Sequence, residues 1–177
     1  IIMKKGDFEE TDEDDKINGK GQIFYSDGTF KEGSFKDGRL EGPGTFWTWE
    51  GTMKHGEFHE DELNGEGTML FVNGLRLEGT FEQDMLHGVG CIKALDGFKA
   101  KGTFNQGWLE GFGKVIESDG TIKIGVFHKS KLNGEGEIIL TDGTICKGWF
   151  KDDKFIEGQV ICDGIAYVIL DSIDETH

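Results

Sequence analysis

The sequence predicts an all-β fold: an elongated, open, twisted and trough-like antiparallel meander of β-hairpins stacked in a single sheet. Three observations predict it. Glycine columns recur every 23 residues over six units, without insertion or deletion. In the middle of each unit an acidic residue or asparagine precedes a glycine between two short runs with apolar residues, a strong local signal for a hairpin. Two strands of ~6 residues and two turns fill such a unit, so no helix of ordinary length fits.

The composition limits the class of protein. The chain has 177 residues, 19 Lys and Arg against 34 Asp and Glu, and a formal charge of −15. Its length predicts about one domain, and a hydrophobic fraction of 36% is enough to fold. A single proline excludes collagen-like and proline-rich chains. The charge argues against a nucleic-acid partner, because phosphate binding needs a basic face. No apolar run reaches the ~18–20 residues of a membrane span.

Four glycine columns define the repeat and hold 24 of the 29 glycines. A Gly-x-Gly pair opens each unit at Gly19/Gly21, Gly42/Gly44, Gly65/Gly67, Gly88/Gly90, Gly111/Gly113 and Gly134/Gly136. The other two columns are Gly28, Gly51, Gly74, Gly97, Gly120 and Gly143, and Gly33, Gly56, Gly79, Gly102, Gly125 and Gly148. A phenylalanine column follows at Phe35, Phe58, Phe81, Phe104, Phe127 and Phe150, and a leucine column at Leu40, Leu63, Leu86, Leu109 and Leu132, with Phe155 in the sixth unit.

These columns predict the turn and the packing. Asp27-Gly28 and its equivalents are expected to form type I′ hairpin turns, because glycine adopts the positive φ that such a turn needs. Glycine inside a strand weakens it unless another group approaches the backbone closely. We therefore expect each phenylalanine to lie over the Gly-x-Gly backbone of a neighbouring unit, where a Cβ would clash. Stability then comes from the stacking of neighbours.

The chain divides into three parts around this array. Residues 1–18 form half a unit with Gly6-Asp7-Phe8 and an acidic loop. That loop is expected to be solvated, because an EF-hand needs an oxygen ligand where Lys16 lies and a glycine where Ile17 lies. Residues 19–156 hold the six 23-residue repeats. Residues 157–177 form a degenerate end with a capping strand at Ile165–Leu170 and a tail after it.

The repeat resembles the MORN (membrane occupation and recognition nexus) family over residues 19–156. The likeness is carried by Gly-x-Gly, Asp-Gly and Gly-x-Phe at fixed spacing, as in Gly134-Glu135-Gly136, Asp142-Gly143 and Gly148-Trp149-Phe150. The family usually has a tyrosine two residues before the last glycine, where this chain has Lys31, Lys54, Leu77, Ala100, Lys123 and Cys146. The resemblance implies an antiparallel sheet used as a scaffold or adaptor in cytoskeletal assemblies or appended to enzymes, and binding to acidic phospholipids has been proposed for the family.

Motifs for catalysis, metals or cofactors are not indicated. The Gly-x-Gly pairs do not extend to GxGxxG or to a Walker loop. His55 and His59 lie four residues apart, but no further ligand follows at a zinc-site spacing. No nucleophile–histidine grouping recurs at a motif spacing. We therefore expect no enzyme activity, no metal and no cofactor. Three cysteines without a CxxC pattern favour a reduced, cytoplasmic compartment.

Aromatic residues outside the regular columns are the candidate partner-binding residues, because stacking of the repeats does not require them. The candidates are Tyr25, Trp47, Trp49, Phe71 and Trp108. Aromatic side chains are enriched at interface hot spots. Trp47 and Trp49 share a face if they lie on one strand. The alternative interpretation is that these rings cover neighbouring glycines.

A second candidate set is basic. Units four and five carry Lys93, Lys99, Lys101, Lys114, Lys123, Lys129 and Lys131. Lysines near an anionic leaflet attract it by ~1 kcal/mol each, although stable binding usually takes a denser cluster. The set is interpreted either as a site for acidic lipids or as a solvated face.

Three functions follow as hypotheses. The first is a non-catalytic scaffold or adaptor that binds a protein or peptide segment on the repeat sheet or at its edge. The second is peripheral association with acidic phospholipids through repeats four and five. The third is the regulatory array of a larger enzyme, of the lysine methyltransferase or lipid kinase type. Open sheet edges also allow a homodimer.

Overall fold

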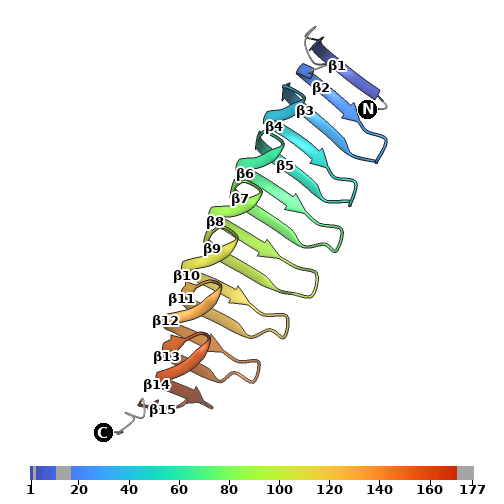
Figure 1. Cartoon of the computed structure of the whole chain (residues 1–177). Helices are drawn as coiled ribbons and strands as arrows, with labels where there is room; N and C mark the ends of the chain where they lie inside the picture. The colour runs from blue at the N-terminus through green and yellow to red at the C-terminus, as the bar shows by residue number, and fades with distance from the viewer. Residues whose placement is uncertain (2, 11–16, 171–177) are drawn as a thin grey trace, which may run out of the picture. The chain divides into compact units, whose positions relative to one another are not determined.

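The computed structural model describes residue 1 and residues 3–10 and 17–170. Fifteen strands follow one another in chain order in one open antiparallel sheet, and the described residues contain no helix (Figure 1). The all-β hairpin meander predicted from the sequence is therefore confirmed. The predicted acidic loop falls largely on residues 11–16 and the predicted tail on residues 171–177, outside the described residues.

The chain forms two compact units, residues 1–90 and 91–177. Unit 1 contains β1 (Met3–Glu10), β2 (Ile17–Phe24), β3 (Phe30–Lys36), β4 (Arg39–Trp47), β5 (Met53–His59), β6 (Glu62–Leu70), β7 (Arg76–Glu82) and the larger part of β8 (Met85–Lys93). Unit 2 contains β9 (Lys99–Asn105), β10 (Trp108–Ile116), β11 (Ile122–His128), β12 (Lys131–Ile139), β13 (Ile145–Lys151), β14 (Lys154–Cys162) and β15 (Ile165–Ile169).

Two kinds of turn alternate along the chain, and the sequence assigned type I′ geometry to the wrong one. Asp27-Gly28 lies in a longer loop, in which the N–H of Gly28 donates to the carbonyl of Tyr25 at 3.2 Å. Positive φ in that loop falls on Gly28 alone, at 94°. The Asp27 carboxylate accepts from the N–H of Thr29 at 2.9 Å, which closes the loop without a two-residue turn.

The tight turns lie at the other end of each hairpin and mostly lack the Asp-Gly signature. Glu60 and Asp61 have φ of 53° and 72°, positive at both central positions as a type I′ turn requires. The equivalent pairs are Asp37-Gly38, Gln83-Asp84, Gln106-Gly107, Lys129-Ser130, Asp152-Asp153 and Asp163-Gly164. The ends of the strands beside these turns curl round strongly (Figure 1).

Four of the tight turns are bonded to the leucine that lies 21 residues earlier in the chain. The N–H of Asp61 donates to the carbonyl of Leu40 at 3.2 Å, and the N–H of Leu40 donates to the Asp61 carboxylate at 2.8 Å. The same pair of bonds joins Asp84 to Leu63, Ser130 to Leu109 and Asp153 to Leu132. These bonds join each repeat to the one before it.

The core consists of the phenylalanine and leucine columns, which are buried on one face of the sheet. The strand glycines are closely approached, as predicted, but the side chain that approaches them is mostly a leucine and not the predicted phenylalanine. A Cβ on Gly33 would lie 2.8 Å from the carbonyl oxygen of Pro43 and 3.0 Å from Leu40 Cδ2. At Gly67 the nearest side chain is likewise a leucine, Leu63, at 3.0 Å. A phenylalanine ring is the close neighbour chiefly at Gly21, because the curl of the strand folds each leucine back over its own glycines.

The sheet has two unlike faces, because successive side chains of a strand point to opposite sides. We call the face with the buried phenylalanine and leucine columns the core face, and the other the open face. Strands contact chiefly their neighbours in chain order. Within the described part of each unit, no second layer of secondary structure covers the open face.

Candidate functional site

The open face of unit 1 carries an apolar ladder, formed by one residue from each of five successive strands. Its members are Phe24, Phe30, Trp47, Met53 and Leu70, and each is the cross-strand partner of the next. The rings of Phe24 and Phe30 lie with their centroids 4.7 Å apart. Trp47 is 42% exposed, since no second layer covers it. The ladder is therefore an apolar stripe open to solvent.

A hollow of about 340 Å³ lies at the middle of this ladder. Its apolar walls are Trp47, Met53 and Leu70, and its polar lining is Thr45, His55, Thr68 and Arg76. Thr45 Oγ1 and His55 Nδ1 are hydrogen-bonded at 2.9 Å, and Arg76 forms an ion pair with Glu78 at 2.5 Å. We call this hollow with its seven residues the Trp47 hollow. An apolar pocket with a few polar groups on its rim is typical of a binding site.

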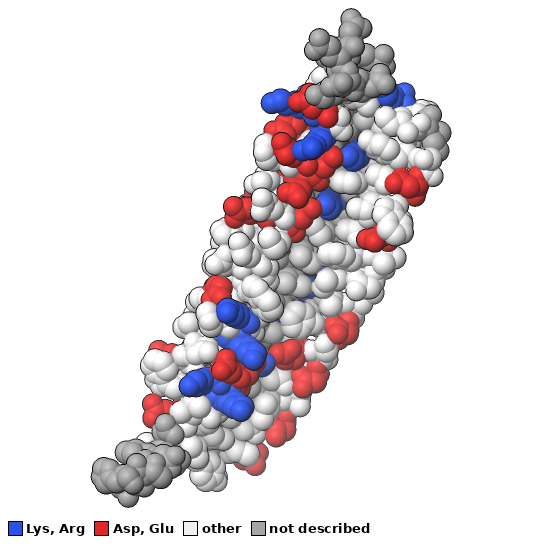
Figure 2. All heavy atoms as spheres, viewed as in Figure 1, with Lys and Arg blue, Asp and Glu red and all other residues white. Residues whose placement is uncertain are grey.

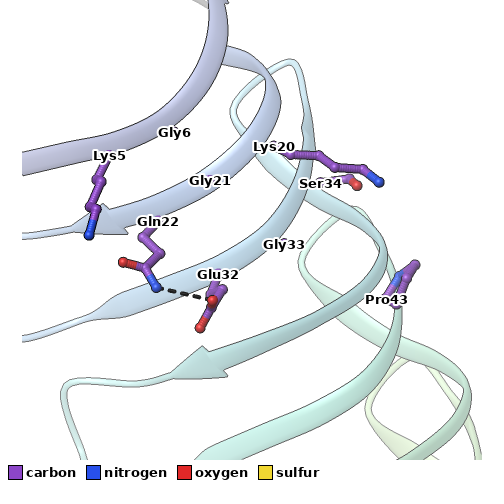
Figure 3. A pocket seen from close by; sticks show the side chains of 9 residues that line it. All are labelled: Lys5, Gly6, Lys20, Gly21, Gln22, Glu32, Gly33, Ser34 and Pro43. Carbon is purple, nitrogen blue, oxygen red and sulfur yellow. Dashed lines mark hydrogen bonds between the residues drawn. The ribbon is translucent and has the colours of Figure 1, made fainter.

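A second hollow on the open face of unit 1 is polar. It measures about 410 Å³, and its floor is the backbone of Gly6, Gly21 and Gly33. Gln22 Nε2 donates to Glu32 Oε1 at 3.0 Å across its edge (Figure 3). It lacks large apolar walls, so the Trp47 hollow is the stronger candidate for a partner-binding site.

The five aromatic residues predicted to bind a partner do not form one cluster. Trp47 lies in the Trp47 hollow, whereas Trp49 lies in the loop after β4 and is 68% exposed. The condition that both tryptophans lie on one strand is not met. Tyr25 lies beside the core face, with Lys31 Nζ 5.6 Å from its ring centroid, and Phe71 occupies the equivalent loop position. Trp108 begins β10 in unit 2.

Most residues of the Trp47 hollow could not be predicted from the sequence. Met53, Leu70, Thr45 and Thr68 carry no signal of their own, because any strand of a meander contains such residues. Strand alternation is the signal that identifies them, but it depends on knowing the length of each turn.

The open face of unit 2 has its own exposed apolar residues. Phe112 and Val126 are cross-strand partners, 71% and 40% exposed, and Trp149 is 56% exposed. Val126 and Trp149 both lie within 4 Å of the position of a Cβ on Gly134, so here a ring does cover a glycine. A hollow of about 320 Å³ lies between Phe112 and Lys147. We call Trp108, Phe112, Val126 and Trp149 the aromatic belt.

The lysines predicted as a lipid site are divided between different parts of the fold. Lys93, Lys99, Lys101 and Lys114 lie on the open face. Lys123 lies on the core face, in ion pairs with Glu117 at 2.7 Å and Asp153 at 3.3 Å. Burial opposes its charge, but the bond to Glu117 and the charge of Asp153 hold the pKa of Lys123 above its usual value. Lys129 lies in a tight turn and Lys131 begins β12.

Charge pairs on the core face link strand to turn. Lys31 pairs with Asp61 at 2.7 Å and Lys54 with Asp84 at 2.5 Å, and both lysines lie over the Phe46 ring, at 4.8 and 5.2 Å. Each aspartate is a residue of a tight turn, 30 positions after its lysine. Where the turn residue is Ser130, the residue 30 positions before it is Ala100. A lysine therefore occurs 30 positions before a tight turn when the second turn residue is an aspartate.

Acidic side chains recur on the loops with the Asp-Gly pair, for example Asp27 in unit 1 and Asp119 in unit 2 (Figure 2). The N–H two residues later donates to each of these carboxylates, which holds their pKa below the usual range. Clusters of three or more metal-ligating side chains are absent from residues 1, 3–10 and 17–170.

Comparison with known protein families identifies the repeat. The model of the MORN repeat matches residues 13–30, 32–52, 55–76, 78–97 and 101–122. The chain belongs to the MORN repeat family. These MORN matches end before β12, although β12, β13 and the longer loop between them repeat the same geometry. At the family's tyrosine position, this MORN protein has in three of six repeats a lysine that pairs with a tight turn, Lys31, Lys54 and Lys123.

Solved structures show a similar fold at low sequence identity. The SAS-4 (dCPAP) TCP domain in complex with a Proline Rich Motif of Ana2 (dSTIL), from Drosophila melanogaster, matches with a TM-score of 0.54 and 13% identity, over 94% of this chain and 88% of that chain. The TCP10 domain of Danio rerio CPAP, in complex with a STIL peptide, matches with a TM-score of 0.40 and 16% identity over 88% and 68%. No curated protein matches in sequence. Among the described residues, no helix is long and apolar enough to span a membrane.

Proposed function

We propose that this MORN array is a non-catalytic scaffold or adaptor that binds an extended protein segment on the open face of unit 1. The observation that carries the proposal is the Trp47 hollow, an apolar pocket in the middle of an exposed ladder. A sheet face without a second layer keeps this apolar surface in contact with water, and covering it with a partner releases that water. The family and the structural matches are consistent with a binding module.

A segment in the extended polyproline II conformation suits this surface. Such segments bind in grooves lined by aromatic side chains, and they lose little entropy because their conformation is already formed. The similar TCP domain from Drosophila is described in complex with a proline-rich motif. Within the proposed site Trp47 is the anchor, and Thr45, Thr68 and Arg76 are hydrogen-bond donors for peptide carbonyls. Trp49, in the loop after β4, is proposed to flank the segment. Tyr25, Phe71 and Trp108 stay predicted contacts for partners elsewhere.

Binding of short peptides to the full chain tests this function. The probes are peptides of about ten residues with Pro-x-x-Pro and apolar x, compared with the same peptides carrying glycine for proline. We expect proline-dependent binding that Trp47→Ala weakens at least about tenfold, the loss of a hot-spot side chain. Tyr167→Ala is the matched control, an exposed aromatic residue outside both the hollow and the aromatic belt. Equal binding by Trp47→Ala and the wild type, or no binding by any probe, would refute the proposal.

Peripheral binding to acidic lipids is a weaker candidate. Two of the seven proposed lysines do not lie on the open face with the others, because Lys123 is ion-paired on the core face and Lys129 lies in a tight turn. Acidic side chains such as Asp96 and Asp119 also lie on the loops of the same repeats. Vesicles with and without phosphatidylserine, sedimented at low and high salt, distinguish this function. The third hypothesis, a regulatory array within a larger enzyme, and the cytoplasmic location both stay predictions.

A further inference from the structure

Unit 2 has an exposed apolar surface that the proposed peptide site does not use. The aromatic belt lies on the open face of β10, β11 and β13. Its three aromatic side chains, Trp108, Phe112 and Trp149, are each more than half exposed, at 55%, 71% and 56%. Apolar patches of this kind on a polar surface mark sites of interaction.

The open face around the belt is basic, although unit 2 as a whole is acidic. On β9–β13 this face carries three glutamates and six lysines, Lys99, Lys101, Lys114, Lys131, Lys147 and Lys151. None of the six has an ion pair within the described part of the chain. The acidic residues of the unit are largely in its loops and turns, for example Asp119, Asp142 and Asp152. The open face of β9–β13 therefore combines exposed apolar side chains with a net positive charge, although Glu135 and Glu157 lie opposite Trp149.

The open face of unit 1 has the opposite charge and its own apolar centre. On β4–β7 it carries two arginines and six glutamates, Glu41, Glu57, Glu62, Glu66, Glu78 and Glu82. Three residues of the apolar ladder, Trp47, Met53 and Leu70, lie on β4, β5 and β6 of this surface. Residues 1–90 hold 9 Lys and Arg against 20 Asp and Glu, so the long-range field of unit 1 is also negative. The two faces are complementary in charge.

We infer that the open face of unit 2 binds the open face of unit 1 of a second copy of the chain. The usual cover for an apolar sheet face is another sheet at ~10 Å, with side chains interdigitating between the two. Five strands at ~4.8 Å and nine residues at ~3.4 Å give a face of roughly 700 Å². This is close to the ~800 Å² per partner of a standard protein interface. Complementary charges favour this pairing over unit 1 on unit 1 or unit 2 on unit 2, in which the two faces carry the same charge.

The molar mass of the full-length chain in solution tests the inference. Sedimentation equilibrium over about 1–200 µM, the range of a moderate interface, should show a mass that rises above the 19.7 kDa monomer and falls again in high salt. Lys101→Glu/Lys114→Glu/Lys147→Glu and Glu41→Lys/Glu57→Lys/Glu66→Lys should each weaken self-association at least about tenfold. An equimolar mixture of the two variants should recover association, because their reversed faces are complementary again.

Controls separate this contact from other ways to associate. Asp96→Lys/Asp119→Lys/Asp142→Lys reverses charge on the loops of unit 2 and should leave self-association unchanged. Far-ultraviolet circular dichroism checks that each variant is folded. A wild-type chain that stays monomeric, association that the face reversals leave unchanged, or variants that fail to recover on mixing would each overturn the inference. Pairing through the edge strands would produce association that the face reversals leave unchanged.

Discussion

At the scale of single residues, the least expected feature is the set of lysines at the position where the family usually has tyrosine. Lys54 is mostly buried, with only 13% of its side chain exposed, and pairs with Asp84, whose other carboxylate oxygen accepts from the N–H of Leu63. One aspartate thus satisfies both a charge and a backbone donor. Breaking a buried pair costs more than the pair contributes, because it leaves the remaining charge without a partner.

We predict that Lys54→Leu destabilises the chain by about 1–3 kcal/mol, since Asp84 is left unpaired. The double variant Lys54→Leu/Asp84→Ser should recover most of that loss. Serine keeps the hydroxyl bond to the leucine N–H, as Ser130 does with Leu109 at 3.0 Å. Urea unfolding of the two single variants and the double variant measures the coupling. Additive losses would show that the pair is not coupled.

His59 predicts a pH dependence at the surface of unit 1. The hydrogen bond from the imidazole to Glu41, at 3.0 Å, and the charge of that carboxylate raise the pKa of His59. A pKa raised by folding means that the protonated histidine stabilises the fold. This contribution is complete below the unfolded pKa of ~6.5 and is lost as the pH rises through the folded value. NMR titration should place the midpoint above that of an ordinary histidine, and Glu41→Gln should bring it back. A midpoint unaffected by Glu41→Gln would contradict this cause.

At the scale of the strand and hairpin, glycine has two separate tasks. Gly56 has φ of 148° and faces the next strand, where a Cβ would lie 2.3 Å from the carbonyl oxygen of Glu66. Gly28 has φ of 94° in its loop, and nothing lies within 4 Å of its Cβ position. The first glycine permits two strands to approach each other, whereas the second only permits a turn.

The two glycines therefore predict different costs for the same substitution. Gly28→Ala should cost about 1–2 kcal/mol, the strain of a left-handed backbone without a clash. Gly56→Ala should cost at least about 4 kcal/mol or prevent folding, because the backbone of a paired strand has to move. Thermal unfolding of the two variants compares them directly. Equal losses would show that close packing at Gly56 is not the cause of its cost.

The repeat, its period and its strands could be predicted from the sequence, because glycine, phenylalanine and leucine columns reflect local rules of packing. Which residues share a face of the sheet could not be predicted in the same way. A two-residue turn at Asp27-Gly28 would place Phe24 opposite Lys31, whereas the longer loop places it opposite Phe30. One residue of difference in a loop moves a whole strand to the other face. The apolar ladder and the Trp47 hollow were hidden for this reason, although Trp47 itself stood out as an aromatic residue outside the columns.

At the scale of the whole molecule, both proposed contacts use the open face of unit 1. A peptide in the Trp47 hollow and a second copy of the chain would cover the same ladder. Two ligands that bind the same surface exclude each other, so the occupancy of one lowers the apparent affinity for the other.

We therefore predict that a Pro-x-x-Pro peptide binds more weakly as the concentration of the wild-type chain rises through the range of self-association. In Lys101→Glu/Lys114→Glu/Lys147→Glu the peptide affinity should be independent of protein concentration, because the competing copy no longer docks. Titrations at several chain concentrations measure this. If the peptide affinity stays constant while the wild type self-associates, the peptide and the second copy do not bind the same surface.

The link between each lysine and a turn 30 residues later has a consequence for how such arrays are recombined. A lysine and its aspartate belong to different 23-residue repeats, so a repeat is not a self-contained module. Excising residues 65–87 removes Asp84 and brings Gly107 to the same distance from Lys54, leaving the ammonium group with no counterion. Grafting, duplicating or deleting repeats in this chain therefore has to move the cation together with the hairpin tip that neutralises it.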